Sequence, residues 1–222
     1  MKNICFLILL FFSLQSFGQT KKHTIKLGIQ MGGTSHLGAS GLGYHGQYDY
    51  VIFDRLSASI GIGQIYGNTT WGGTSRGSAG GVVMWDNTYE LISNEGYNYA
   101  EINGLYSYSK RWNVIDLKIG GGVTFLSNWL NYDKDVNIVR GIIVGGEEVR
   151  HRDNVSMVNI VLDNDFKLND RLLINWKFIF RKVINDQEPL EIVTNYGGSG
   201  RSTSTSEMDM LGAMVIGLGY RF

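Results

Sequence analysis

The sequence predicts an all-β fold, a closed eight-stranded antiparallel up-and-down transmembrane β-barrel, and three observations support this prediction. Eight segments alternate apolar and polar residues with the period of two that is typical of strands. The connections alternate between short and long, so that all the short turns fall at one end of the barrel. The 222 residues include 30 glycines and only 18% charged side chains, which suits many turns and a crowded interior.

Residues 1–18 have the pattern of a secretory signal peptide. Lys2 precedes an apolar run, Ile4–Leu14, and the small residues Ser16 and Gly18 mark a cleavage point before Gln19. The single cysteine, Cys5, would leave with this peptide. Residues 19–222 are therefore expected to form one barrel domain without a thiol.

The first four strands are expected at Thr24–Gly33, Leu42–Phe53, Leu56–Tyr66 and Tyr97–Ser109. Isoleucine and leucine occupy alternate positions in the first and third segments, and tyrosine is prominent at alternate positions in the second and fourth. In each segment the other face is mainly small or polar. The intervening connections are Thr34–Gly41, Asp54-Arg55 and Gly67–Glu95, of which only the second is short.

The last four strands are expected at Asn113–Phe125, Val155–Leu168, Leu172–Val183 and Met208–Phe222. The seventh shows the pattern most clearly, because Trp176, Phe178 and Phe180 alternate with asparagine and basic residues. Short connections lie at Lys110–Trp112 and Asn169–Arg171, and long ones at Ser127–Asn154 and Ile184–Ser206. The only proline, Pro189, falls in a long connection, where it interrupts no ladder.

The distribution of charge indicates which face meets lipid. The apolar, aromatic-rich face carries almost no ionisable residue, and the opposite face collects the charges, so we expect an interior charge network of Lys26, Asp49, Glu101, Asp116, Lys118, Asp163, Lys177 and Arg181. Paired glycines on the charged face leave room for these long side chains. A soluble lipocalin-like barrel is the alternative, but it would have to enclose the aromatic face in a small lumen.

The turn at Asn169–Arg171 predicts the register of the sixth and seventh strands. Asp163 should lie opposite Lys177, and Asn159 opposite Arg181. Because buried charges must pair, the first interpretation is a plug of salt bridges that fills the barrel. A gated ion or proton path is the alternative interpretation of the same residues.

The closing stretch Met214–Phe222 alternates apolar residues, has an aromatic residue two positions before the end and finishes on phenylalanine. With the signal peptide and the eight strands, it resembles the small OmpA/OmpX-type outer-membrane barrels over the whole mature length. The resemblance implies a porin-like protein of the Gram-negative cell envelope, located in the outer membrane. It implies that Leu218, Tyr220 and Phe222 are read by the barrel-assembly machinery, and that outer-membrane lipid is a partner. Aromatic residues suit the two rims of such a barrel, with Tyr108, Tyr220 and Phe222 at the periplasmic rim and Tyr66, Phe125 and Trp129 at the outer rim.

Three short motifs match by chance on this interpretation. Gly41–Gly46 fits GxGxxG and Gly73–Gly77 fits GxSxG, but both patterns need a helix that the sequence does not predict. Asp133–Asn137 has the first spacings of a calcium loop without its glycine and glutamate. The four histidines show no metal-ligand spacing; His45 is expected inside the barrel, and His36 and His151 in solvated loops. No cofactor, metal or catalytic site is therefore expected.

Function is expected to reside in the long loops. Trp85 and Tyr89 are candidate contacts in a hairpin expected to turn at Asp86–Thr88, and a second hairpin is expected around Gly145-Gly146. The Gly/Ser/Thr-rich stretch Gly197–Ser206 is expected to be mobile. The hairpins could bind a partner by strand addition or could merely shield the barrel mouth from lipopolysaccharide.

The predicted role is therefore a non-enzymatic one in surface interaction, adhesion or an envelope complex. With 20 basic and 20 acidic residues, the chain is not expected to bind nucleic acid. A lipid-acting enzyme for acyl transfer or deacylation, with His36 beside Ser35 or Ser40, is the first alternative. A narrow channel is the second.

Overall fold

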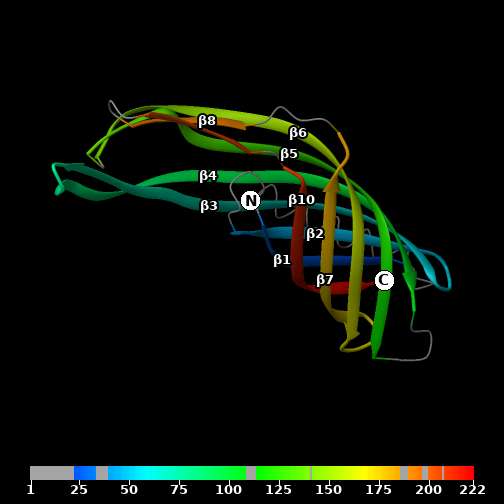
Figure 1. Cartoon of the computed structure of the whole chain (residues 1–222). Coiled ribbons are helices and arrows are strands. Elements are labelled where there is room, and N and C mark those ends of the chain that lie inside the picture. The colour runs from blue at the N-terminus through cyan, green and yellow to red at the C-terminus, as the bar shows by residue number, and fades with distance from the viewer. Residues whose placement is uncertain are drawn as a thin grey trace, which may run out of the picture.

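The computed structural model describes residues 23–33, 40–108, 114–140, 142–185, 190–196, 200–206 and 208–222. Almost all of these residues lie in ten strands (Figure 1). The strands are β1 His23–Gly33, β2 Ser40–Phe53, β3 Leu56–Ala79, β4 Val82–Ser107, β5 Ile115–Val139, β6 Ile142–Lys167, β7 Leu172–Val183, β8 Leu190–Tyr196, β9 Gly200–Ser206 and β10 Met210–Arg221. Within the described ranges, no helix is long and apolar enough to cross a membrane.

Eight of the strands close into an antiparallel ring, as the sequence predicts. The order runs from β1 through β7 to β10, and β10 pairs back with β1. The closure brings the two ends of the ring together, because His23 and Phe222 exchange backbone hydrogen bonds of 3.3 and 3.0 Å. The short turns at residues 54–55 and 168–171 lie at this same end, which in this class of barrel faces the periplasm.

Side-chain exposure confirms the inside and outside faces. The isoleucines, leucines and aromatics of the apolar face are largely exposed, for example Leu27 at 64%, Ile62 at 62% and Phe125 at 58%. The charged face is buried, and Arg181, Lys26 and Lys177 are among its largest fully enclosed side chains. Because exposed apolar residues circle the ring, hydrocarbon is the only surrounding that makes this arrangement stable.

Four strands are much longer than the sequence predicts, and they correct two expected turns. The β3–β4 register runs unbroken from Leu56↔Tyr106 to Gly77↔Trp85 and closes at Gly80-Gly81, whose φ angles are +59° and +82°. Two successive positive φ angles fit the tight hairpin turn that glycine forms most easily. The expected turn at Asp86–Thr88 is therefore wrong, and those residues lie within β4.

The second expected turn, at Gly145-Gly146, is also wrong. The β5–β6 pairing that starts at Ile115↔Phe166 continues to Val139↔Ile142, so the chain reverses between these two residues and Gly145-Gly146 lie within β6. Arg140 has a φ of 53° at this turn. The pairing of β5 with β6 shifts register between Lys134 and Ile138, as at a β-bulge.

The last long connection contains a hairpin that the sequence did not predict. Strand β8 pairs with β9 along its whole length and runs parallel to β5 at Val136–Ile138. Within the stretch Gly197–Ser206 that is expected to be mobile, Gly200–Ser206 forms β9, while residues 197–199 lie outside the described ranges. The expected signal peptide, the connection Lys110–Trp112, Pro189, Ser35 and His36 also lie outside them.

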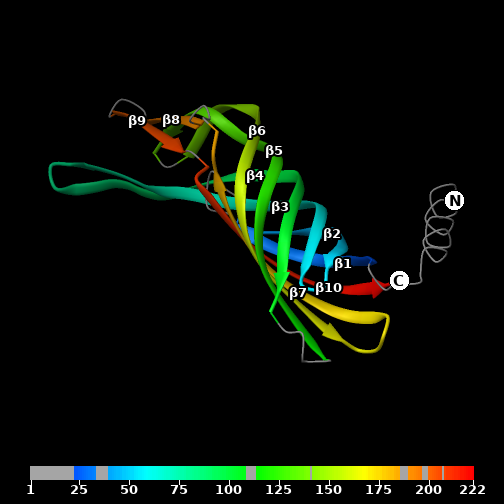
Figure 2. The same cartoon turned by 90° about the vertical axis from the view of Figure 1, so that its right-hand side faces the viewer.

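Beyond the ring the sheet divides into two arms. The β4–β5 pairing stops at Asn94↔Asn131, whereas β3–β4 and β5–β6 continue to their turns. The first arm is a two-stranded ribbon, and the second is a sheet of β6, β5, β8 and β9. Figures 1 and 2 show the two arms projecting from the same end of the ring.

Candidate functional site

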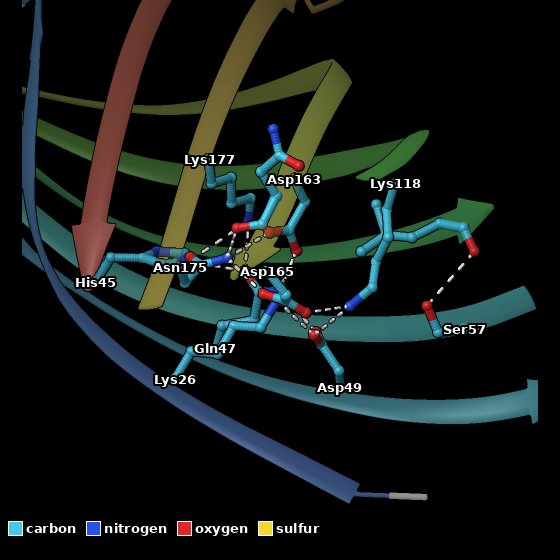
Figure 3. Close-up of polar contacts among 12 residues, drawn as sticks. Lys26, His45, Gln47, Asp49, Ser57, Lys118, Asp163, Asp165, Asn175 and Lys177 are labelled. Carbon is cyan, nitrogen blue, oxygen red and sulfur yellow. Dashed lines mark hydrogen bonds and ion pairs between the residues drawn. The ribbon is translucent and has the colours of Figure 1, made fainter. Parts of the chain in front are cut away.

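The periplasmic part of the lumen is filled by a cluster centred on the Lys26 ammonium. Its Nζ lies 2.9 Å from Asp49, 2.8 Å from Asp163 and 2.7 Å from Asp165, so that β1, β2 and β6 are joined at one point (Figure 3). Lys118 of β5 closes the cluster, at 2.6 Å from Asp165 and 3.6 Å from Asp49. Three carboxylates thus share two ammonium groups.

A second cluster, nearer the middle of the barrel, is centred on Glu101. Its two carboxylate oxygens accept from Lys177 at 2.5 Å and from Arg181 at 2.8 Å. The Arg181 guanidinium carbon also lies 4.4 Å from the centre of the Tyr99 ring, a cation–π contact. Here two cations share one carboxylate.

The two clusters are connected through Gln47. Its amide oxygen accepts from Lys177 at 2.8 Å, and its amide nitrogen donates to Asp49 at 2.6 Å and Asp163 at 3.0 Å. His45 extends the network, with its ring nitrogens 2.7 Å from the Tyr99 hydroxyl and 3.1 Å from Gln47. The surplus negative charge of one cluster is therefore matched by the surplus positive charge of the other.

The structure brings together seven of the eight residues predicted for the interior network, and it adds Asp165 to them. Asp116 stands apart: it is half-buried, and no ion pair among the described residues includes it. The reason is that Asp116 lies opposite Asp165, a like charge, and the ammonium of Lys118, two residues along β5, bonds to Asp165 instead.

The register prediction is confirmed, but it does not give the ion pairs. Asp163 lies opposite Lys177 and Asn159 opposite Arg181, as expected. The salt bridges nevertheless run across the lumen, from Asp163 to Lys26 and from Lys177 to Glu101. Strand tilt sets those cross-lumen neighbours, and a single sequence carries no direct signal for it.

Gly61 shows why the charged face needs glycines. A Cβ atom at Gly61 would lie 2.8 Å from the Glu101 side chain and 2.9 Å from the His45 ring. That space is occupied by side chains of the two neighbouring strands, β4 and β2. The predicted purpose of the paired glycines therefore holds at this position.

The outer part of the lumen is packed mainly with apolar side chains, and the polar residues Glu95 and Asn128 are buried beside them. The apolar cluster consists of Ile65, Tyr97, Tyr99, Leu126, Val155, Met157, Met208 and Leu211, all at most 5% exposed. A smaller group, Leu105, Val161, Ile179 and Val215, lies on strands that also carry charged residues. The interior thus contains an ionic network and an apolar plug in series.

The residues of the predicted C-terminal signal lie on the closing strand. Leu218 is 65% exposed on the lipid-facing side of β10. Tyr220 stacks on Phe222, and Phe222 stacks on His23 with ring centres 5.6 Å apart. At the opposite rim Tyr66 and Trp129 pack with ring centres 5.6 Å apart, where outer-rim aromatics were expected.

The candidate contact residues Trp85 and Tyr89 lie on β4 in the first arm, opposite Gly77 and Gly73. The three chance motifs also fall inside strands, in β2, β3 and β5. His151 lies in β6 rather than in a solvated loop, and its Nε2 is 2.6 Å from Asp153. In the described ranges, no group of three or more histidine, cysteine or acidic side chains is placed to hold a metal ion.

Comparison with known proteins identifies the fold. No family model and no curated protein matches the chain. Among solved structures, Neisserial surface protein A is similar with a TM-score of 0.52 and 10% identity, over 90% of this chain and 97% of that one. A major outer-membrane protein of Thermus thermophilus has a TM-score of 0.52 and 11% identity, over 89% and 99%. Ail, the attachment invasion locus protein of Yersinia pestis, in complex with the heparin analogue sucrose octasulfate, has a TM-score of 0.50 and 11% identity, over 90% and 97%.

The chain thus has the fold of the small outer-membrane β-barrels, as the resemblance in its sequence implies. Its continuous apolar belt and its closed ring suit the outer membrane of a Gram-negative bacterium, and the predicted location is confirmed.

Proposed function

We propose that this protein is a non-enzymatic surface-binding protein that holds an extracellular or envelope protein partner with its two arms. The observation that supports this proposal is that both arms extend past the ring and expose apolar side chains there. In the first arm Val83 and Met84 are 44% and 62% exposed. In the second, Val139, Ile142, Ile143 and Val144 form an apolar tip, exposed by 39 to 62%. The membrane does not cover these residues, and exposed apolar groups of this kind favour a protein contact.

The charge of the arms favours a protein over a polyanion. Residues 69–93, 132–149, 190–196 and 200–206 of the two arms together contain seven acidic and four basic residues. Ail binds a sulfated sugar in the complex noted above, but acidic arms would repel such a ligand. The arms also present open backbone edges, to which a partner strand can add.

The barrel interior supports a role without catalysis or conduction. The buried carboxylates of the network accept hydrogen bonds from lysine, arginine or amide groups, and the outer lumen is closed by apolar packing. An acid held in this way is poorly suited to proton transfer, and an eight-stranded lumen that is already filled leaves little space for ions.

Site-specific photo-crosslinking in intact cells tests the proposal. A photoreactive phenylalanine analogue would replace Met84 or Val144 on the arms, with Ile60 in the lipid-facing belt as the matched control. We expect a protein adduct of discrete size from both arm positions and none from Ile60. The adduct from Val144 should disappear when residues 70–92 of the first arm are replaced by Asn-Gly, which joins the paired residues Thr69 and Ser93 by a two-residue turn.

Absence of arm adducts in cells that contain a heat-modifiable, correctly folded barrel would contradict the proposal. A change in lipid A mass upon expression would contradict the non-enzymatic part of it. Discrete conductance steps in a planar bilayer would favour a channel instead.

A further inference from the structure

The outer rim of the barrel differs from one side to the other, and the β3–β6 side carries an ordered polar surface. Outward-facing residues of these four strands form rows, because adjacent residues are register partners. One row within the apolar belt is Ile60, Ile102, Val123 and Val158. The next row, Ile62, Ala100, Phe125 and Ser156, ends the belt.

Three polar rows follow directly above the belt. The first is Gln64, Asn98, Ser127 and Asn154. The second is Tyr66, Gly96, Trp129 and Arg152, and the third is Asn68, Asn94, Asn131 and Arg150. We call these three rows the rim platform. It contains amide, hydroxyl and aromatic groups and two arginines, and it contains no acidic residue.

Trp129 gives the rim platform a fixed centre. Its ring packs against Tyr66, and a Cβ atom at Gly96 would lie 2.7 Å from it, so the ring rests directly on the glycine backbone. The Arg150 guanidinium carbon lies 5.5 Å from the centre of the same ring. Both arginines are exposed, so their donors are available to an anionic ligand outside the barrel.

A groove joins the rim platform to the belt. It has a volume of about 400 Å³ and is lined on the outside by Asn98 and Ser127 above and by Ala100 and Phe125 below. A ligand that follows this groove would contact polar groups at one end and apolar groups at the other. Only an amphipathic molecule satisfies both ends.

We propose that the rim platform binds a phosphorylated glycolipid of the outer leaflet. Its phosphate would be held by Arg150 and Arg152, its sugar by the amide rows and the Trp129 ring, and its first acyl segment by the groove. Arginine matches a phosphate with paired donors, and tryptophan suits the boundary between apolar and hydrated layers. This site is separate from the arms and from the protein contact proposed for them.

Among the described residues, the opposite side of the rim lacks the features of the rim platform, so a ligand that needs them would bind on one side of the barrel. On β2 and β1, Leu42 and Met31 continue the row of Tyr66, and both are exposed and apolar. On β7 the exposed cation Lys182 lies opposite Met210 and Val158, without the amide rows. Lys182 is therefore the matched control for the two arginines.

Native mass spectrometry of the full chain in detergent micelles, titrated with bisphosphorylated lipid A, tests the site. We expect one bound lipid per barrel, with affinity lowered roughly tenfold or more in the Arg150→Gln/Arg152→Gln double variant. Lys182→Gln should change the affinity by less than about twofold, which lies within the ordinary scatter of surface changes. Trp129→Phe should retain part of the binding, and Trp129→Ala should lose more. Heat-modifiability on SDS gels checks that each variant is folded.

Equal binding by the double variant and the wild type would overturn the proposal, as would equal binding of lipid A without phosphates. Displacement by inorganic phosphate alone would identify a free-anion site and overturn the lipid assignment. Loss of a dimer in the arginine variants, without loss of lipid, would assign the rim platform to a second copy of the chain and overturn it as well.

Discussion

The two parts of the lumen fill the same ring with different materials. Toward the periplasm, Lys26 and its neighbours fill the space with charges that depend on one another. Toward the cell surface, residues such as Ile65 and Leu126 fill it with apolar packing. A charge that loses its partner stays buried and costly, whereas an apolar side chain that loses a methyl group leaves only a small cavity. The charged part should therefore respond to single substitutions much more strongly than the apolar part.

The largest effect is expected for Lys26→Met. It leaves Lys118 as the lysine that still contacts Asp49 and Asp165, and it leaves Asp163 with amide partners only among the described residues, so the free energy of unfolding should fall by about 3–5 kcal/mol. Urea unfolding in detergent micelles, followed by tryptophan fluorescence, measures the change. If Lys26→Met unfolds at the same urea concentration as the wild type, the ionic network does not stabilise the barrel.

The second-largest loss of stability is expected on the lipid-facing surface of the barrel and not in its lumen. Ile60 is 53% exposed in the apolar belt, and Ile60→Arg should cost roughly 2–4 kcal/mol because a charge then lies at mid-bilayer depth. Refolding into lipid vesicles gives this value, with Ile60→Val as the control for loss of shape. A stable Ile60→Arg barrel in vesicles would mean that the belt does not meet hydrocarbon.

Lys177→Met should cost less than Lys26→Met, although both remove a buried lysine. Glu101 keeps Arg181 as a partner, so about 1–3 kcal/mol is expected from the lost bonds to Glu101 and Gln47. The same urea titration measures both variants. If Lys177→Met is the more damaging, the surplus charges of the two clusters are not balanced as the geometry indicates.

The smallest effect should come from the apolar part. Ile65→Val removes one methyl group from a fully buried site and should cost roughly 0.5–1.5 kcal/mol. Ser107→Ala, on the same face near the periplasmic rim, should change the stability by less than about 0.5 kcal/mol and serves as the reference. A loss for Ile65→Val as large as that for Lys26→Met would remove the distinction between the two parts.

The alternation of side chains was sufficient to predict the ring. It placed Lys26, Glu101 and Arg181 inside and Leu27 outside, because each strand has only two faces. Their ionic partners could not be predicted, because Lys26 meets Asp163 across the lumen at a depth set by strand tilt. Asp116 was assigned to the network because it alternates with the inward-facing residues of its strand. The sequence did not reveal that its neighbour on β6, Asp165, carries the same charge.

The arms were underestimated because glycine was taken as a sign of loop. In β3 the period-two pattern weakens among glycines and threonines, so the third strand was expected to end at Tyr66, and the hairpin expected in the following connection was short and turned at Asp86–Thr88. Extending the ring's own register would have located both turns, since pairing that begins at Leu56↔Tyr106 converges on Gly80-Gly81. The rim platform was also missed, because its rows are visible only when four strands are aligned.

The length of the first arm sets the distance between its tip and the rim of the barrel. Residues 69–79 of β3 extend beyond the last row of the rim platform, and at about 3.3 Å per residue they span on the order of 35 Å. That distance is similar to the thickness of the hydrocarbon core itself. Gly80-Gly81 therefore stands about one membrane thickness away from the rim, with nothing within 4 Å of the positions where their Cβ atoms would lie. A short peptide inserted between these two glycines would be displayed at the tip of the arm, and the barrel would not need to adjust to it.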